Sequence, residues 1–285
     1  MTGRSSMNDK LPPLPDALPA PTTDAHTHAL STAEHSGLAV ADALALARSV
    51  NVTRIVEVGT DVESSLAALA LARQYPEAVA AVAIHPNDAA RLGERLDAEL
   101  ARLEAIVGSS DRVRGVGETG LDYFRTTDAP GRARQRTAFA AHISWAKRYD
   151  RALVIHDRDA HADVLDVLDA EGAPERVQMH CFSGDADFAR ACLERGYWLS
   201  FPGTVTFKAN EALREALDLT PPDRLLVETD APYLTPMPHR GKPNSSYLVP
   251  LTVRFIAERR GVDVAGLCEQ LAANASALFG DWGAA

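Results

Sequence analysis

The stretch from residue 79 to residue 117 reads VAAVAIHPNDAARLGERLDAELARLEAIVGSSDRVRGVG. It opens with the continuous apolar run VAAVAI and closes with the short run VRGVG, and a more polar segment separates the two. In that segment apolar residues recur at steps of four, three and four, as on one face of a helix: Leu96, Leu100, Leu103 and Val107. The stretch therefore predicts a buried strand, an amphipathic helix over residues 96–107 and a second buried strand.

The same alternation continues along most of the chain. We expect strands at residues 22–27, 54–58, 79–84, 113–117, 152–155, 177–180, 197–201 and 224–228. Several of these runs are continuously apolar, which is typical of parallel strands that are buried on both faces. Longer helices are expected at residues 130–148, 246–260 and 263–278. Eight strands, each followed by a helix, favour a parallel sheet with crossover connections.

The length of 285 residues restricts the architectures that this order can form. The simplest is an α/β fold of one domain, a TIM-like (β/α)8 barrel. An open doubly wound sheet is the alternative, but no GxGxxG turn follows the first strand, so dinucleotide binding has no support. We expect residues 1–21, which are rich in proline, to form a flexible leader, and residues 22–285 to form the barrel.

Composition narrows the class of function. Hydrophobic residues make up 46% of the chain, as expected of a globular protein with a core. The net charge of −10 disfavours a broad basic surface for nucleic acid, although metal ions and a few local cations can still hold a phosphate. The sequence shows neither a signal peptide nor an apolar run long enough for a membrane span. We expect a cytoplasmic protein without a membrane partner, and a monomer rather than an obligate oligomer.

The three cysteines do not predict a metal site. They form no CxxC pair, which argues against a disulfide framework or a thiolate zinc site and fits a reducing compartment. Cys181 directly follows His180, and adjacent residues of a strand face opposite ways. We therefore interpret Cys181 as a structural thiol.

Polar residues that can bind metals stand where the apolar runs end. They follow or close five different strands: His26 and His28 the first, Glu118 the fourth, His156 the fifth, His180 the sixth and Asp230 the eighth. The carboxyl ends of parallel strands meet at one rim of a barrel, where barrel active sites are built. Although a single histidine or carboxylate at a strand end is usually only solvated, we expect these six residues to converge at that rim.

The residue types indicate divalent metal ions. His26 and His28 are two positions apart in an extended segment, so both imidazoles point to the same side. A set of four histidines and two carboxylates suits zinc, manganese, cobalt or magnesium. Six ligands exceed what one tetrahedral catalytic ion uses, so two ions that share a carboxylate account better for the number.

Five stretches of the chain, in this order, resemble the motifs of TatD-type deoxyribonucleases in the amidohydrolase-like superfamily. They are DAHTH (24–28), GETGLDYFR (117–125), VIHDRDA (154–160), HCFSG (180–184) and ETDAPYLTP (228–236). The segments LSFPGTVTFK (199–208) and RGKPN (240–244) also fit the pattern. The resemblance extends from about residue 22 to 280. It departs at Ser245 and Ser246, where a proline is expected nearby.

The resemblance implies a ligand set and an activity. One metal would be held by His26, His28, Glu118 and Asp230, and the other by Glu118, His156 and His180, with Glu118 as the bridging ligand. Glu118 and Asp230 would be the catalytic residues, and Asp230 would orient the attacking water and accept its proton. The implied reaction is hydrolysis of DNA, as a 3′–5′ exonuclease on single strands, with Zn, Mg or Mn.

Substrate contacts are expected from side chains in the rim loops. A few local groups could contact phosphate in an otherwise acidic protein: His85, Arg125, Arg158, Lys208, Arg240 and Lys242. His85 could equally orient a neighbouring residue of the site. Tyr123 and Tyr233 could stack on a base or line the barrel mouth.

Two other functions remain open from the sequence. The same metals could serve an aminoacyl-ester deacylase, a lactonase or an amidohydrolase, because a fold does not determine the bond that is cleaved. No lysine follows a strand where a carboxylated lysine would bridge the metals, which favours the TatD branch. A structural metal in a binding protein is the third hypothesis, but such sites are usually closed and four-coordinate.

Overall fold

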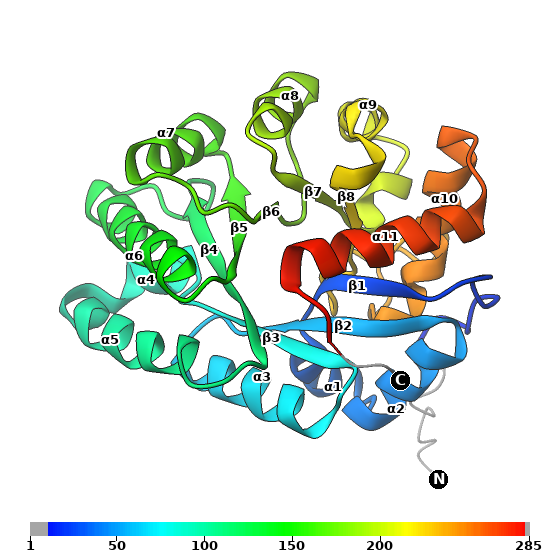
Figure 1. The fold of residues 1–285 in the computed structure, drawn as a ribbon, viewed down its shortest axis with the longest axis horizontal. Helices are drawn as coiled ribbons and strands as arrows, with labels where there is room; N and C mark the ends of the chain where they lie inside the picture. The colour runs from blue at the N-terminus through cyan, green and yellow to red at the C-terminus, as the bar shows by residue number, and fades with distance from the viewer. Residues whose placement is uncertain (1–10, 283–285) are drawn as a thin grey trace, which may run out of the picture.

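The computed structural model describes residues 11–282 and shows eight parallel strands surrounded by helices (Figure 1). Each strand pairs with the next along the chain: β1 (Thr22–Thr27), β2 (Val52–Val58), β3 (Ala78–Val82), β4 (Val113–Asp122), β5 (Ala152–Arg158), β6 (Val177–Met179), β7 (Trp198–Phe201) and β8 (Leu225–Val227). The predicted TIM-like (β/α)8 barrel is confirmed, and each observed strand overlaps a predicted one.

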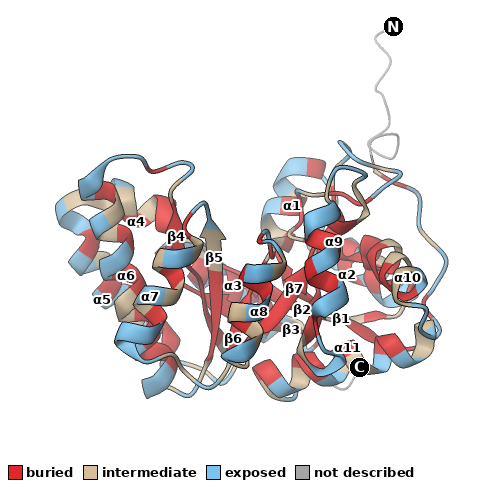
Figure 2. Ribbon diagram, turned by 90° about the horizontal axis from the view of Figure 1, so that it is seen from above, coloured by how far each residue is buried: buried red, intermediate tan, exposed pale blue. Residues whose placement is uncertain are grey.

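Helices cover the outside of the barrel and one of its ends. They are α1 (Ala29–Ser36), α2 (Val40–Ser49), α3 (Val62–Gln74), α4 (Pro86–Leu92), α5 (Leu96–Val107), α6 (Ala129–Arg148), α7 (His161–Glu171), α8 (Ala186–Glu194), α9 (Glu211–Leu219), α10 (Val249–Arg260) and α11 (Val264–Phe279). Short 3-10 turns add η2 (Gly93–Arg95), η3 (Gly203–Thr206), η4 (Pro222–Arg224) and η5 (Ser246–Leu248). Figure 2 shows buried residues on the strands and on the helix faces toward them. No helix among the described residues is both long and apolar enough to span a membrane.

The barrel closes between β8 and β1 through individual hydrogen bonds, since the described residues form no ladder there. The backbone N–H of Asp230 donates to the carbonyl of His26 (3.0 Å), and that of His28 donates to the carbonyl of Ala231 (3.0 Å). The backbone N–H and hydroxyl of Thr229 donate to the carboxylate of Asp24, at 2.9 and 2.6 Å. The polar ends of these two strands therefore both close the barrel and carry candidate ligands.

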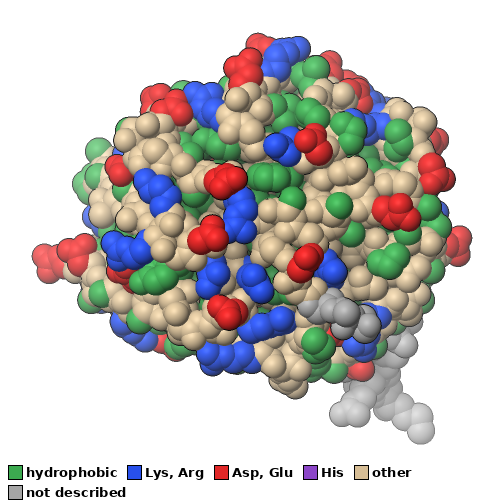
Figure 3. All heavy atoms as spheres, in the orientation of Figure 1, with side chains coloured by type: hydrophobic (Ala, Val, Ile, Leu, Met, Phe, Trp, Pro, Cys, Tyr) green, Lys and Arg blue, Asp and Glu red, His purple; other side chains and the backbone are tan. Residues whose placement is uncertain are grey.

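Helix α11 covers the end of the barrel where the strands begin (Figure 1). Leu278 and Phe279 are buried in one apolar cluster with strand residues such as Val56 and Val154. The side-chain amide of Asn274 donates to the carbonyl of Leu225, the first residue of β8, at 2.7 Å. Figure 3 shows this end of the molecule, and no histidine is visible on it. The other end of the barrel, where the strands finish, is not covered by α11 and can hold a functional site.

The predicted leader lies partly outside the described residues, which begin at residue 11. From there the chain runs against the barrel, where Leu18 is buried. The hydroxyl of Tyr247 donates to the carbonyl of Pro12 (2.7 Å), and Arg254 donates to the carbonyl of Ala17 (2.8 Å). Packed structure thus starts earlier in the chain than the expected boundary at residue 22.

Candidate metal centre

Glu118 lies at the centre of the candidate site, inside β4 and not after it as predicted from the sequence. The register between β4 and β5 shifts at this point, between Val116 and Thr119. A Cβ at position 117 would lie 2.4 Å from the Cβ of Val154, and one at position 120, where φ is +129°, would lie 2.1 Å from the carbonyl oxygen of His156. Only glycine fits both positions, so Gly117 and Gly120 let β4 run close to β5 with Glu118 between them.

One carboxylate oxygen of Glu118 faces the first pair of histidines. Its Oε2 lies 3.7 Å from Nε2 of both His26 and His28. Oδ1 of Asp230 lies 3.7 and 3.6 Å from the same two nitrogens, which are 3.4 Å apart. Ligands about 2.1 Å from a common tetrahedral ion are separated by about 3.4 Å, so each of these carboxylate oxygens lies at a distance from the two nitrogens that fits a metal site.

The other carboxylate oxygen of Glu118 faces a second set of histidines. Its Oε1 lies 2.7 Å from Nδ1 of His156 and 2.8 Å from Nε2 of His180. Nε2 of His85 lies 3.5 Å from the same oxygen. The two oxygens of one carboxylate thus face two separate groups of nitrogen donors.

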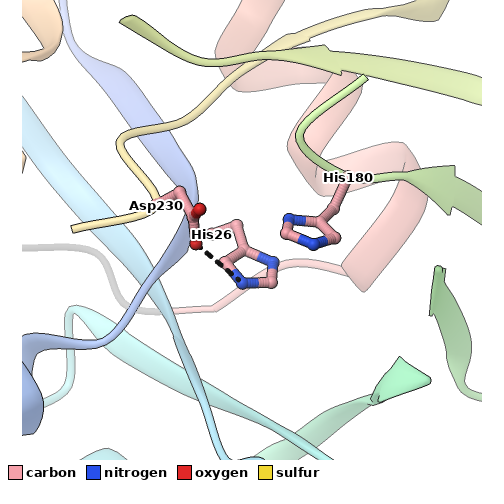
Figure 4. Close-up of side chains that lie close together, drawn as sticks. All are labelled: His26, His180 and Asp230. Carbon is pink, nitrogen blue, oxygen red and sulfur yellow. Dashed lines mark ion pairs between the residues drawn. The ribbon is translucent and has the colours of Figure 1, made fainter. Parts of the chain in front are cut away.

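The two groups of histidines are joined by His26 and His180. Figure 4 shows the fully buried His26 between Asp230 and His180. The rings of His26 and His180 are stacked with their centroids 3.9 Å apart. The structure therefore brings together all six predicted ligands, and His85 lies beside Glu118 and His156 in a further candidate group.

The charges at the site favour ionised carboxylates. Burial opposes ionisation of Glu118, but the surrounding histidines, above all His180, hold the pKa of its carboxyl well below the usual range. Burial also disfavours protonated His28, yet the hydrogen bond and charge of Asp230 raise its pKa to about 9. Protons on these histidines occupy the nitrogens that a metal would use, so metal binding would release protons and strengthen as pH rises.

A cavity of about 1110 Å³ lies over these residues at the open end of the barrel. Of the predicted substrate contacts, His85, Arg125 and Arg158 line it. Lys208, Arg240 and Lys242 are not among its lining residues, and the guanidinium of Arg240 instead lies 4.6 Å from the ring centroid of Phe207.

Comparison with known proteins agrees with this site. The model of the family described as TatD related DNase matches residues 23–280. The chain belongs to the TatD family. A Mycobacterium tuberculosis protein named as an uncharacterized metal-dependent hydrolase TatD is 47% identical over 248 residues, which are 85% of this chain and 92% of that protein.

Two further TatD relatives bear on activity and fold. A Cronobacter sakazakii protein named 3′-5′ ssDNA/RNA exonuclease TatD is 36% identical and covers 83% of this chain and 90% of its own length. The crystal structure of YjjV, a TatD homologue from Escherichia coli, is similar with a TM-score of 0.80 and 28% identity, over 91% of this chain and 98% of its own. The chain is accordingly a metal-dependent hydrolase of the TatD type.

Two carboxylates of this TatD site were missed by the sequence analysis. Oδ2 of Asp122 lies 3.2 Å from Nε2 of His156, and Oε1 of Glu228 lies 3.2 Å from Nδ1 of His180. Asp122 stands four positions after Glu118 in the same strand, which is the spacing of one strand face. That spacing was a usable signal for a residue that orients a candidate ligand histidine, whereas Glu228 lies after the end of β8 and had no such signal.

The interpretation of Cys181 as a residue facing away from the site is wrong. Strand β6 ends at Met179, so the alternation of a strand no longer applies at position 181. Cys181 has a φ of +43°, and its backbone N–H donates to Oε1 of Glu228 at 2.7 Å. Its side chain lines the cavity, where burial raises the pKa of the thiol well above the usual range and keeps it protonated.

Proposed function

We propose that this TatD-family protein hydrolyses phosphodiester bonds of single-stranded DNA from the 3′ end, at a site that holds two divalent metal ions. The observation that carries the proposal is the position of Glu118, whose two oxygens face separate groups of histidines. A carboxylate placed in this way can bridge two ions. The nitrogen and oxygen donors suit Zn, Mn or Mg.

The activity of a relative supports nucleic acid as the substrate. The Cronobacter protein is named as a 3′-5′ exonuclease of single-stranded DNA and RNA, and it aligns with most of this chain. The cavity is large enough for a nucleotide, and Arg125 and Arg158 line it. Guanidinium groups bind phosphate well because their donors match its oxygens.

Different residues of the chain would have different roles in hydrolysis. Bound divalent ions would supply Lewis acidity toward water and toward the phosphoryl oxygens. Asp230, whose side chain is 17% exposed at the cavity, would orient the attacking water and accept its proton. Arg125 and Arg158 would hold the phosphates of the substrate, and Asp122 and Glu228 would keep the histidine rings in place.

The test is cleavage of DNA labelled at the 3′ or the 5′ end by metal-stripped protein, with Mg, Mn or Zn restored separately. Stepwise shortening that requires metal and starts at the 3′ end is expected. The Glu118→Ala and Asp230→Ala variants should both lose turnover, whereas Glu99→Ala, in α5 and not among the residues that line the cavity, should retain it. Undiminished activity in both site variants would contradict the assignment.

No cleavage by protein that has bound two ions would point instead to a different ester or amide as substrate. The cytoplasmic location and the monomeric state expected from the sequence stay predictions.

A further inference from the structure

Two aromatic side chains at the open end of the barrel are exposed to solvent. Phe124 is 57% exposed and Tyr233 is 62% exposed, and no other aromatic side chain among the described residues is mostly exposed. Exposed apolar surface is unfavourable in water, at about 25 cal/mol per Å². Two such residues beside the same cavity therefore indicate a ligand with flat apolar faces.

Both aromatic residues stand close to the metal centre along the chain but on different sides of it. Tyr233 lines the cavity three residues after Asp230, in the loop that follows β8. Phe124 follows β4, next to the cavity-lining residue Arg125. Strands β4 and β8 are four apart in a barrel of eight, so the two loops lie on opposite sides of the opening.

The turn after β4 holds Phe124 outward. The backbone N–H of Arg125 donates to Oδ1 of Asp122 at 2.8 Å, which fixes the turn. The hydroxyl of Tyr123 donates to Oδ2 of Asp163 at 2.7 Å, and the guanidinium of Arg132 lies 4.1 Å from the centroid of its ring. The hydroxyl of Tyr123, one of the two tyrosines expected to stack on a base, is thus bound and its side chain is only partly exposed, whereas its neighbour Phe124 is mostly exposed.

The loop that carries Tyr233 is also held firmly. The side-chain amide of the fully buried Asn244 donates to the carbonyl of Tyr233 at 2.6 Å. The backbone N–H of Asn244 donates to the carbonyl of Pro232 at 3.1 Å. The backbone of Tyr233 is therefore fixed while its ring stays free, which reduces the entropy lost when a ligand stacks on it.

Positive charge lies over one face of the Phe124 ring. The guanidinium of Arg158 is 3.9 Å from the ring centroid, so a base would stack on the opposite face of Phe124, which is 57% exposed. Within the described part of the chain, no carboxylate lies within 4.0 Å of the side-chain nitrogens of Arg158 or Arg125. A flat apolar face next to an unpaired cation matches a nucleobase and its phosphate.

We propose that Phe124 and Tyr233 stack on unpaired nucleobases on the two sides of the metal centre, and that this stacking selects single strands. The inference rests on the proposed function and specifies which part of the substrate is recognised. In a duplex the inner bases are covered on both faces by their neighbours and the terminal base has one free face, so a paired end cannot offer bases to both rings. Stacking is tolerant of sequence because every base has such a face.

The experiment compares a normal single strand with one whose last three nucleotides at the 3′ end are abasic. Both substrates have the same phosphodiester bonds, but only the first has bases to stack. The parent protein should show a higher kcat/KM for the normal strand. In Phe124→Ala and in Tyr233→Ala, the ratio of the two kcat/KM values should fall by about five- to 150-fold, because stacking contributes on the order of 1–3 kcal/mol per base.

Matched variants separate stacking from loss of structure. Phe124→Trp and Tyr233→Phe keep a ring and should keep the ratio, and so should Leu66→Ala, an exposed residue on α3. Equal cleavage of both substrates by the parent protein, with unchanged ratios in the variants, would overturn the stacking inference and leave the nuclease proposal standing. A parent protein that cleaves neither substrate with its metals bound would overturn both.

Discussion

At the scale of single residues, the site depends on carboxylates that contact the histidine ring nitrogens not facing Glu118. Asp122 lies beside the nitrogen of His156 that faces away from Glu118, and Glu228 does the same for His180. The carbonyl of Val58 lies 2.8 Å from Nδ1 of His28. Such contacts fix the tautomer and the orientation of a ligating ring.

We expect Asp122→Asn and Glu228→Gln each to weaken metal binding by about ten- to a hundredfold, because a poorly oriented histidine binds less well. Competition with a chelating dye measures this affinity. Asp163→Asn is the matched control, since Asp163 contacts Tyr123 and no histidine of the site. Unchanged affinity in both site variants would show that the histidines do not need these partners.

The six ligand positions could be predicted from the sequence because each closes or follows an apolar run. The carboxyl ends of the parallel strands formed by these runs meet at one rim of the barrel. The sequence could not predict which of Tyr123 and Phe124 would be exposed. That choice depends on the turn fixed by Asp122 and on a partner 40 positions away, Asp163. Contacts of this kind exist only after the barrel has folded.

At the scale of secondary-structure elements, α6 joins the ends of β3 and β4 through the buried His142. Nε2 of His142 accepts a hydrogen bond from the backbone N–H of Ile84 (3.3 Å), so its Nδ1–H donates to the hydroxyl of Thr119 (2.7 Å). The bond from Ile84 requires a neutral ring, because a protonated Nε2 cannot accept. Burial lowers the pKa of His142 to about 3.

His142 should make the protein less stable in acid. The unfolded chain takes up a proton on this histidine below about pH 6.5 and the folded protein does not, so stability falls as pH falls from 6.5 toward 3. Between pH 7 and pH 5 this single group should cost about 2 kcal/mol of unfolding free energy. Urea unfolding should show that loss in the parent protein and a smaller one in His142→Gln; an equal loss in both would contradict the assignment.

Helix α11 should contribute stability without affecting the site. Phe279 is 1% exposed and packs at the closed end of the barrel. We expect Phe279→Ala to lower the free energy of unfolding by about 3–5 kcal/mol, as for other large-to-small changes in a core. Thermal unfolding measures the loss. Metal affinity of the folded variant should be unchanged, and a large drop would mean that α11 also shapes the open end.

Element boundaries were predictable where a local pattern decides them. Helix α5 has the bounds that its apolar spacing predicts, Leu96–Val107. The predicted helix 246–260 is divided into η5 and α10, and Pro250 stands in the first turn of α10, where proline favours the start of a helix. Strand β4 runs five residues past its predicted end to Asp122, because its pairing with β5 continues through two glycines whose role is visible only in three dimensions.

At the scale of the whole molecule, the net charge of −10 contrasts with the few cations at the cavity. Binding of single-stranded DNA should therefore depend on local contacts and respond weakly to salt. Each phosphate contact on a single strand contributes about 0.7 to the slope of log affinity against log salt. We expect Arg125→Gln and Arg158→Gln each to reduce that slope by about this amount, measured by fluorescence anisotropy in a NaCl series.

Two observations would contradict this account of binding. A steep slope in the parent protein would indicate a broad basic surface that the sequence and the structure do not support. Slopes unchanged in both arginine variants would remove Arg125 and Arg158 from the substrate contacts. Arg102→Gln, on the outer face of α5, is the control and should keep the slope of the parent protein.

The central claim is that Glu118 bridges two divalent ions, and the number of ions bound per chain tests it most directly. Metal-stripped protein should be titrated with Zn or Mn and the bound ions counted by elemental analysis. We expect two ions in the parent protein and in Glu99→Ala, one in His28→Ala, one in His156→Ala, and greatly weakened binding of both in Glu118→Ala. A single ion in the saturated parent protein, or two ions bound with unchanged affinity in Glu118→Ala, would contradict it.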